Sequence, residues 1–313
     1  MILVLAGGVG AARFIEGLVQ VVPPETITAV VNTGDDMELH GLRISPDLDI
    51  VTCTLADLID REQGWGISGD TDECMSWLVK LGGPGWFKLG DRDLALHIRR
   101  TAMLREGFTL SQITDSFRQS LGVAVRIMPM SDDLVPTHIL TDVGEMHFEE
   151  YFVRRRAQDV VRGVRYVGIE SARPAPGLLD LIASAEMILI APSNPVVSVG
   201  PILAIPGVRE AIIASPAPVI TVSPIVGGAP IKGPAAPLMR ALGLEISAVG
   251  VAQAYAGLLD GIVIDQVDAN LAVRIEALGV RVAVTDTIMR GPTQKANLAR
   301  VALQLAEARP AAV

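Results

Sequence analysis

The first residues that could do chemistry end the opening hydrophobic run of the chain, as Gly7-Gly8-Val9-Gly10. A glycine turn between a strand and a helix lets backbone N–H groups approach a phosphate, and the helix N-terminus adds partial positive charge. The spacing matches neither the dinucleotide-binding glycine pattern nor the Walker loop, which also needs a lysine followed by Ser or Thr. Because glycine also permits plain close packing, the turn alone predicts either a phosphate cradle or an ordinary tight turn.

Two acidic groups follow the second hydrophobic run, as Asn32-Thr33-Gly34-Asp35-Asp36 and then Pro46-Asp47-Leu48-Asp49. Mg²⁺ typically takes one or two protein carboxylates together with substrate phosphates. One carboxylate could instead act as the base for an attacking hydroxyl. Asp and Asn are also common turn and capping residues, so a structural role stays open for each of them.

Three further polar stretches could belong to the same site. Lys88 stands beside a glycine in Phe87-Lys88-Leu89-Gly90-Asp91-Arg92-Asp93, in a chain with only four lysines. A lysine there could contact a substrate oxyanion as a compact charge, whereas Asp91 or Asp93 is expected to be partly structural, as a helix cap. The stretches 192–200 and 223–228 combine hydroxyls, an amide, prolines and glycines, which is equally typical of ordinary turns.

Other kinds of site are not supported by the residue patterns. The histidines at 40, 97, 138 and 147 lack the spacing of zinc ligands, and no G-x-S-x-G nucleophile elbow is present. The three consecutive arginines from Arg154 to Arg156 are interpreted as a solvated face or salt-bridge cluster. Cys53 and Cys74 are expected to be buried, reduced thiols of a cytosolic protein.

The composition limits the class of protein. The chain has 313 residues, half of them apolar, and a formal net charge of −9. An acidic chain gains little from phosphate counterion release, so extended nucleic-acid binding is not expected. Neither a signal peptide nor a membrane-spanning run is recognised. We therefore expect a cytoplasmic protein whose partners are small molecules, with no nucleic acid or membrane partner.

The elements that must position these residues are short hydrophobic strands. Near-continuous Val, Ile and Leu runs at 2–6, 27–31, 187–191, 218–222 and 280–284 alternate with helical patterns. This alternation predicts an α/β fold, a Rossmann-like, mostly parallel sheet with helices on both faces. Ligands of such sheets bind at the carboxyl ends of strands near the switch point. The glycine and polar clusters follow these strands, so one shared cleft is expected.

The middle of the chain departs from the repeating strand–helix pattern. Residues 91–105 and 109–121 read as helices, the second with a capping box from Thr109 and Gln112. Residues 123–128, 137–141 and 146–153 read as short strands. We interpret the chain as a single nucleotide-binding domain, 1–313, with a helical and β insertion subdomain at about 91–175.

Taken together, these stretches resemble the 2-phospho-L-lactate transferase family of deazaflavin coenzyme F-420 biosynthesis. The resemblance rests on segments spread over about three quarters of the chain, and their combination is more specific than any one of them. The segments are LAGGVGAARF at 5–14, VVNTGDDMELHGLRISPDLDIVTCTLA at 30–56, WFKLGDRDLALHIRRTAMLREG at 86–107, APSNPVVSVGPIL at 191–203 and SPIVGGAPIKGPA at 223–235.

The resemblance implies a reaction and its participants. The donor would be a guanylyl diphosphate ester of lactate or a related three-carbon acid, the acceptor the deazaflavin alcohol Fo, and the product GMP. It implies a Mg²⁺ cofactor and a homodimer. By matching position, Asp35 and Asp49 become the catalytic and metal carboxylates, and Asp49 and Lys88 contact Fo. The implied nucleotide-binding residues are Gly7, Gly8, Val9, Gly10, Ser193, Asn194, Ser198 and Gly200.

Two other functions compete with this one. A non-catalytic nucleotide-binding regulator of the same fold would share the glycine loop, although the stretches around Asp49 and Lys88 favour the transferase. A nicotinamide-dependent oxidoreductase is disfavoured by the glycine spacing. The run Gly69-Asp70-Thr71-Asp72 departs from the family pattern, which leaves the role of Asp70 open between function and structure. The sequence does not distinguish the acid carried by the donor.

Overall fold

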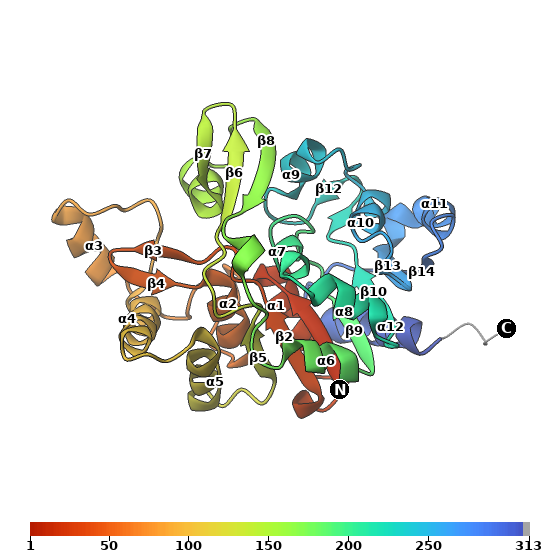
Figure 1. Ribbon diagram of the computed structural model, residues 1–313, viewed down its shortest axis with the longest axis horizontal. Helices are drawn as coiled ribbons and strands as arrows, with labels where there is room; N and C mark the ends of the chain where they lie inside the picture. Colours follow the sequence, from red (N-terminus) through yellow and green to blue (C-terminus); the bar gives the residue numbers. More distant parts are fainter. Residues whose placement is uncertain (309–313) are drawn as a thin grey trace.

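Across residues 1–308, which the computed structural model describes, a seven-stranded sheet forms the centre of the protein (Figure 1). Its strands are ordered β14-β13-β10-β9-β1-β2-β5, and every neighbouring pair is parallel. The strands are β1 Ile2–Ala6, β2 Ile27–Val31, β5 Arg126–Pro129, β9 Met187–Ile190, β10 Val219–Val222, β13 Gly261–Asp265 and β14 Arg281–Thr285. The predicted α/β fold with a mostly parallel sheet is confirmed.

Helices bury both faces of this sheet, which explains why its inner strands are hydrophobic on both sides. Alternate residues of β1 point to opposite faces: Leu3 and Leu5 join one core cluster, and Ile2 and Val4 join the other. One face is covered by α1 Gly8–Leu18, α2 Pro46–Leu55, α5 Leu110–Ser120 and α12 Pro292–Glu307. The other face is covered by α6 Leu178–Ser184, α7 Gly200–Ala204, α8 Val208–Ala214, α9 Ala235–Ala241, α10 Ala248–Ala254 and α11 Ala272–Glu276.

The strand order reverses between β1 and β9. From β1 the chain moves outward through β2 and β5, returns to place β9 on the other side of β1, and continues outward to β14. In open α/β sheets this reversal opens a crevice beyond the carboxyl ends of the two strands, where ligands bind. The loops that follow β1 and β9 contain Gly7 and Ser193 respectively, so the expected site lies at the switch point.

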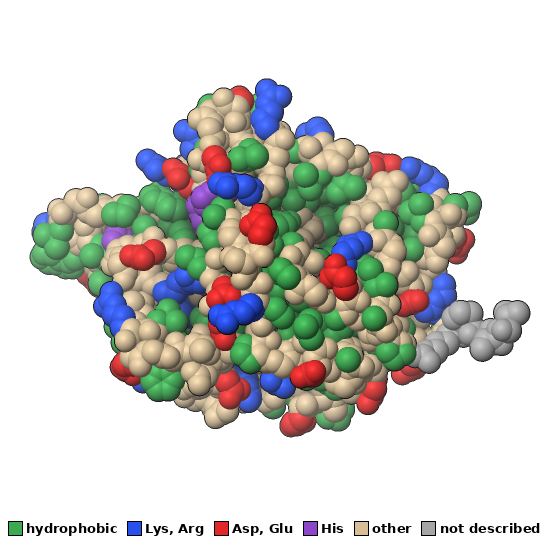
Figure 2. Space-filling model, in the orientation of Figure 1, with side chains coloured by type: hydrophobic (Ala, Val, Ile, Leu, Met, Phe, Trp, Pro, Cys, Tyr) green, Lys and Arg blue, Asp and Glu red, His purple; other side chains and the backbone are tan. Residues whose placement is uncertain are grey.

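A first set of elements outside the sheet lies between β2 and β5. A hairpin of β3 Met37–Leu39 and β4 Leu42–Ile44 packs with α3 Glu73–Lys80 and α4 Asp91–Arg105 around a separate small core. This arm extends to the left of the central sheet in Figure 1, with α3 at its tip. Figure 2 shows hydrophobic side chains at this tip, where Trp77 and Leu81 are 57% and 78% exposed.

A second set lies between β5 and β9. The antiparallel strands β6 Thr137–Thr141, β7 Gly144–His147 and β8 Val161–Tyr166 project at the top of Figure 1. The remaining elements are the antiparallel pair β11 Ile225–Val226 and β12 Ala229–Pro230, the 3₁₀ helices Pro24–Thr26, Ile169–Ser171 and Gln266–Leu271, and a π-helical turn Glu150–Arg154.

The proposed insertion at about 91–175 needs correction, because it is not one unit. β5 falls inside this range but pairs with β2 as the edge strand of the main sheet. The additions therefore form two excursions, and the first begins directly after β2, well before residue 91. The strand expected at 146–153 is also wrong beyond His147, because a helical turn begins at Glu150.

Other local expectations can be checked directly. The capping box at the start of α5 is confirmed, since Thr109 Oγ1 accepts from Gln112 N and Gln112 Oε1 accepts from Thr109 N. Both cysteines are free thiols, but only Cys53 is buried; Cys74 is exposed on α3, so its predicted burial is wrong. Within residues 1–308, no helix is long and apolar enough to cross a membrane.

Candidate active site at the switch point

The glycine turn after β1 packs directly against the loop after β9. Ser193 Oγ donates to the backbone oxygen of Gly7 at 2.9 Å. A methyl group at Gly10 would stand 2.3 Å from the backbone oxygen of Pro192, closer than atoms can approach. Gly8 has a φ of +70°, a conformation that glycine adopts without strain. The turn therefore needs glycine for its close approach to the 191–200 loop as well as for any phosphate.

The proposed nucleotide-binding residues are brought together here. Gly7 and Ser198 are in contact, since a methyl group at Gly7 would stand 2.7 Å from Ser198 Cβ. Asn194 uses its side-chain oxygen to accept from Val196 N at 2.9 Å, which fixes the loop. Gly200 begins α7, and Val9 lies in the first turn of α1. Ser193 and Asn194 thus have demonstrable structural roles, whatever they bind.

A buried carboxylate, Asp47, faces this turn from α2. Its Oδ2 accepts from Asn32 Nδ2 at 2.9 Å, and a methyl group at Gly7 would come within 2.8 Å of the same oxygen. Asn32 follows β2 directly, and its side-chain oxygen accepts from Gly34 N at 2.8 Å. Asp47 therefore connects the end of β2, the glycine turn and the N-terminus of α2.

Three buried acids interact at this point: Asp35, Asp47 and Glu149. Burial raises the pKa of Asp35 well above its ordinary value, and the charges of Asp47 and Glu149 raise it further. Burial raises the pKa of Asp47 to about 7, against the lowering effect of the Asn32 hydrogen bond. Burial and the charge of Asp47 raise the pKa of Glu149 to about 8. Burial and mutual repulsion thus raise the pKa of all three acids, a feature common at functional sites.

Asp49 lies in a different environment, two residues further along α2. Arg100 of α4 donates to Asp49 Oδ1, and His97 Nδ1 lies 3.5 Å from Asp49 Oδ2. Burial lowers the pKa of His97 to about 4, although the charge of Asp49 opposes this shift. Asp49 belongs to the helix that Pro46 starts, so it is not on a loop. Asp49 is half-buried and held between two helices.

The side chain of Asp36 binds the β3–β4 hairpin and the residue that follows it. Its Oδ2 accepts from Ser45 Oγ at 2.7 Å and forms an ion pair with Arg43 at 3.1 Å. Burial raises the pKa of Asp36 to about 6, and Arg43 and Ser45 oppose that shift. These contacts fold the β3–β4 hairpin back onto the end of β2. Asp36 is thus a structural neighbour of the site, distinct from Asp35.

Buried oxygens without a hydrogen-bond partner gather at this edge of the sheet. In the part of the chain that the structure describes, seven buried side-chain oxygens lack a partner, and five of them are here, on Thr33, Asp35, Asp36, Asp49 and Thr137. An unsatisfied buried polar atom typically costs about 1–3 kcal/mol, and such atoms in native proteins call for an explanation such as an ion or ligand. Their concentration marks this edge as the site of a polar ligand.

The carboxylates fit a hard divalent cation only in part. Asp35 Oδ1 and Asp49 Oδ2 are buried and unsatisfied, as oxygen ligands awaiting a cation would be. Among residues 1–308, however, no three His, Cys, Asp or Glu side chains converge on one point. The carboxylates that act most strongly on Asp35 are Asp47 and Glu149. A cation here would therefore need one or two carboxylates and oxygens from a substrate.

Lys88 and its neighbours lie on the segment that leads into α4. Lys88 is exposed and contacts no described residue through a hydrogen bond or ion pair. Asp70 accepts from Arg92 N at 2.9 Å, and Asp91 accepts from Cys74 N at 3.0 Å. Asp93 accepts from Gly90 N at 3.1 Å. The expected capping role is confirmed for Asp93, which pairs with the N-cap Gly90, but not for Asp91, which is the first residue of α4 and instead accepts from Cys74 N at the start of α3. Asp70 is also structural, and Lys88 remains free to bind a ligand.

A cavity of about 320 Å³ opens beside this edge. It combines aromatic and aliphatic walls with charged and imidazole groups; its lining is Asp36, Met37, Glu38, Arg43, Trp86, Leu134, Pro136, His138, His147 and Glu150. Trp86 gives this cavity an indole wall. Phe87 packs edge-on against Trp86 at 5.6 Å, and Leu94 is buried in the core of the arm instead.

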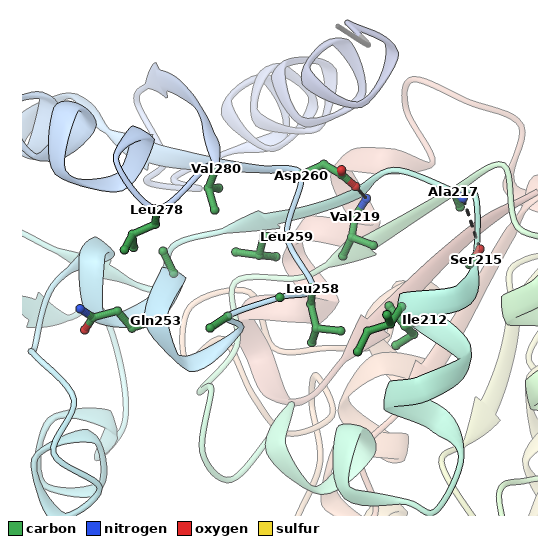
Figure 3. Close-up of a pocket in the computed structure, with 14 residues that line it drawn as sticks. Ile212, Ser215, Ala217, Val219, Gln253, Leu258, Leu259, Asp260, Leu278 and Val280 are labelled. Atoms are coloured by element: carbon green, nitrogen blue, oxygen red, sulfur yellow. Dashed lines mark hydrogen bonds between the residues drawn. The ribbon is translucent and has the colours of Figure 1, made fainter. Parts of the chain in front are cut away.

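A larger cavity, about 430 Å³, lies away from these residues. Figure 3 shows its lining at the amino ends of β10, β13 and β14, with Asp260 accepting from Val219 N at 2.7 Å. These strand ends form the edge of the sheet opposite the glycine turn. Size alone therefore does not identify the active site, which is defined by its polar groups.

Several residues of the site were not predicted from the sequence. Asp47 was recognised only as part of an acidic stretch, although its position in the first turn of α2 places it on the side of the glycine turn. Asn32 was named within the same stretch with a turn role left open, and Arg100 was not singled out. Glu149 comes from the second excursion and carries no local signal at all. Only the tertiary fold brings it to β2.

Known proteins resemble this chain over almost its whole length. The family model described as 2-phospho-L-lactate transferase CofD matches residues 2–296. A protein named phosphoenolpyruvate transferase from Streptomyces griseus is 48% identical over 312 residues, covering 98% of each chain. One named 2-phospho-L-lactate transferase from Methanosarcina mazei is 40% identical over 302 residues, covering 96% of this chain and 99% of that one.

A solved structure shares the fold at much lower identity. The crystal structure of a UPF0052 family member from Bacillus halodurans superposes with a TM-score of 0.66 at 18% identity, covering 96% of this chain and 98% of that one. This likeness concerns the fold alone. The family match and the full-length relatives carry the assignment: this chain belongs to the 2-phospho-L-lactate transferase family of CofD proteins.

Proposed function

We propose that the protein transfers a phospho-hydroxyacid unit from a guanylyl diphosphate donor to the deazaflavin alcohol Fo, releasing GMP. The family supplies the type of transfer. The observation that carries the proposal is the placement of buried acids opposite a glycine turn at the switch point of the sheet. Phosphoryl-type transfer needs positioning and charge neutralisation more than covalent chemistry. The glycine turn would position the phosphates, and the acids would hold a cation that neutralises their charge.

In the proposed reaction the terminal hydroxyl oxygen of Fo bonds to the phosphorus nearer the acid. The bond from that phosphorus to the bridging oxygen of the diphosphate breaks, and the electron pair leaves with GMP. Asp49 takes the hydroxyl proton through its Oδ2, the oxygen that Arg100 does not contact. Arg100 holds Asp49 in place, because an ion pair between two helices fixes the carboxylate against rotation. Asp49 is thus the proposed catalytic base and acceptor contact.

We assign Asp35 to the proposed Mg²⁺ site, in keeping with its unsatisfied Oδ1, whereas Asp49, which the resemblance also gave to the metal, keeps its Oδ2 for the acceptor hydroxyl. When bound, the ion would neutralise charge on the diphosphate and on the departing phosphate. The protein contributes the buried carboxylates and the glycine turn, whose backbone N–H groups Gly7 to Gly10 would receive the nucleotide phosphates. Ser193, Asn194, Ser198 and Gly200 would shape the nucleotide side of the cleft.

The cavity beside the site suits the acceptor. Trp86 gives it an aromatic wall, and Leu134 and Pro136 give it aliphatic surface, as a flat tricyclic ring requires. Lys88 lies nearby in sequence on the same connecting segment, exposed and without a partner. We propose that Lys88 contacts Fo, while the glycine turn and the 191–200 loop contact GDP.

The acid carried by the donor is proposed from the relatives. The relative named for phosphoenolpyruvate transfer is 48% identical to this chain, and the one named for 2-phospho-L-lactate transfer is 40% identical. This difference favours an enolpyruvyl unit over a lactyl unit. We further propose that the enzyme works in the cytoplasm as a homodimer. The exposed free thiol of Cys74 suits a reducing compartment.

Thermal stability with different nucleotides tests the donor assignment. GDP at a hundred times its dissociation constant should stabilise the protein by about 2.7 kcal/mol. UDP and NAD at the same concentration should leave the melting temperature unchanged. Stabilisation by UDP without turnover would indicate a nucleotide-binding regulator, and stabilisation by NAD an oxidoreductase; either result without a GDP effect would overturn the transferase proposal.

A further inference from the structure

A hydrogen bond from the second excursion holds the loop that follows β9. Tyr166 ends β8, the edge strand of the β7-β6-β8 sheet that packs beside α9 (Figure 1). Its hydroxyl donates to the backbone oxygen of Val196. The same side chain lies against Gly200, where a methyl group would overlap the Tyr166 hydroxyl. Tyr166 therefore fixes the loop that carries Asn194 and Ser198, two of the proposed nucleotide-binding residues.

The opposite face of the same small sheet lines the cavity proposed for the acceptor. Pro136 and His138 both line this cavity. Thr137 stands between them and is buried on the other side, because neighbouring residues of a strand face opposite sides of a sheet. Tyr166 is the cross-strand partner of Thr137, so the two share one face. The sheet thus presents one face to the acceptor cavity and the other to the nucleotide loop.

The nucleotide loop is held from outside at two successive backbone oxygens. Tyr166 binds that of Val196, and Asn32 Nδ2 donates to that of Val197 at 3.2 Å. Asn32 follows β2, so the two hydrogen bonds come from different parts of the fold. Loss of the Tyr166 hydroxyl leaves the Asn32 hydrogen bond in place. The loop should then loosen without unfolding.

We propose that Tyr166 is a positioning residue, which couples the acceptor cavity to the nucleotide loop so that Fo and GDP tighten each other's binding. A ligand packed against Pro136 and His138 would restrain β6 and β8, and with them the hydroxyl that holds Val196. The inference rests on the proposed function for the identity of the two ligands. By linkage, each ligand changes the affinity of the other by the same factor, typically about 5–150-fold.

The competing explanation is that Tyr166 is only part of the packing of the fold. The substitution Tyr166→Phe keeps the ring and removes the hydroxyl that reaches Val196. The matched control is Tyr255→Phe. Tyr255 is buried in the core cluster against which Tyr166 packs, and its hydroxyl has no hydrogen-bond partner among the described residues. Its removal should leave the loop in place.

Hydrogen exchange of the full-length protein without ligands tests the positioning role. Ser198 N and Val199 N donate to the backbone oxygen of Asn194 at 3.1 and 3.0 Å, and they report on the loop. Loss of one neutral hydrogen bond typically changes an equilibrium by about two- to tenfold. The two amides should exchange faster by about this factor in Tyr166→Phe and at the parent's rate in Tyr255→Phe. Amides of α5 should be unchanged in both variants, which separates a local effect from a loss of global stability. Unchanged exchange in the loop of Tyr166→Phe would overturn the proposal.

Calorimetric titration of GDP with and without Fo, in the presence of Mg²⁺, tests the coupling. Fo should tighten GDP binding to the parent by at least about fivefold. Tyr166→Phe should lose most of this enhancement, and Tyr255→Phe should keep it. A weaker GDP affinity with the enhancement retained would show a merely structural role and overturn the coupling, as would a parent that binds both ligands independently.

The two measurements separate this inference from the proposed function. Binding of both ligands without coupling would leave the transferase proposal standing and remove the role of Tyr166. A parent that binds neither ligand would overturn the proposed function and the coupling with it, whereas the exchange rates test the positioning role without any ligand.

Discussion

Arg100, which is almost completely buried, donates a hydrogen bond to Asp49 and so joins α4 to α2 beside the active site. Its other hydrogen bonds are to the backbone oxygen of Arg43 at 3.3 Å and the ring of His97 at 3.1 Å, and its guanidinium lies over the Phe117 ring. Asp49 is the carboxylate that balances its charge. The proposed catalytic base therefore also stabilises the fold, and this changes what its removal should do.

Asp49→Ala should abolish transfer and also destabilise the protein, because it leaves the Arg100 charge buried without a partner. Breaking a buried ion pair in this way costs about 3–5 kcal/mol, and the partial exposure of Asp49 places the expected value at the lower end of this range. Asp49→Asn should lose activity but recover most of the stability, since its amide oxygen still accepts from Arg100. Urea unfolding with activity assays measures both. A fully stable alanine variant would show that Arg100 does not depend on Asp49.

Glu149→Gln should stabilise the protein without ligands at alkaline pH. Burial and the charge of Asp47 raise the pKa of Glu149 from 4.5 to about 8. Between these values the folded chain keeps a proton that the unfolded chain has released. The stability from this group is therefore complete below pH 4.5 and is lost as the pH rises through 8.

The useful window for this measurement is pH 6.5 to 8.5. Burial lowers the pKa of His97 and of His147 from 6.5 to about 4. Their contribution to the free energy of unfolding therefore changes with pH only below pH 6.5. Melting temperatures of the parent should fall across the window, and those of Glu149→Gln should fall less, with the variant higher at pH 8.5. Parallel curves for the two proteins would mean that Glu149 is not protonated in the fold.

Lys88→Ala should weaken Fo binding more than GDP binding. Lys88 is exposed and without an ion-pair partner, and it follows Trp86, which lines the cavity beside the site. Lys80→Ala is the matched control, because Lys80 is also exposed but lies over the Trp77 ring at the tip of the arm. Fluorescence titrations with Fo and with GDP measure both affinities. An equal loss of affinity for the two ligands, or a loss of affinity for GDP alone, would show that Lys88 does not lie at the Fo end of the cleft.

Gly10→Ala should impair GDP binding and stability together. The added methyl group would stand 2.3 Å from the backbone oxygen of Pro192, so α1 or the 191–200 loop must move. Such overpacking typically costs about 1–3 kcal/mol. Gly163→Ala is the control, since its methyl group would meet only a flexible leucine side chain at 3.4 Å. Calorimetry should find Gly163→Ala close to the parent, and an unaffected Gly10→Ala would mean that the two segments are not in contact.

The sequence predicted the parts of the fold that depend on local pattern. The hydrophobic runs after Met1 and before Asn32 became neighbouring parallel strands, and Thr109 capped its helix as expected. The predicted boundary of the insertion was wrong because β5 is a short edge strand, and its pairing with β2 is determined by tertiary packing. Periodicity within residues 123–130 does not reveal which sheet a strand will join.

The site was predictable in its location but not in its pairings. The carboxyl ends of parallel strands lie at the same edge of a sheet, so the glycine turn and the loop around Ser193 were expected to meet. The hydrogen bond from Ser193 to Gly7 shows that they do. Asp47 and Asp49 project from α2 in different directions, because they are two residues apart on a helix. Which of them faces the glycine turn depends on the direction in which α2 leaves Ser45. Glu149 and Arg100 reach the site from distant segments, which no local motif records.

Mass spectrometry of Fo incubated with the protein, Mg²⁺ and a guanylyl diphosphate donor tests the central claim most directly. Donors carrying enolpyruvate and lactate are supplied separately, and Asp49→Asn serves as the inactive control. The account predicts Fo extended by a phosphorylated three-carbon unit, with GMP released in equal amount, and faster product formation from the enolpyruvyl donor. Unmodified Fo with both donors, from a protein that binds GDP and remains folded, would contradict the proposed transfer.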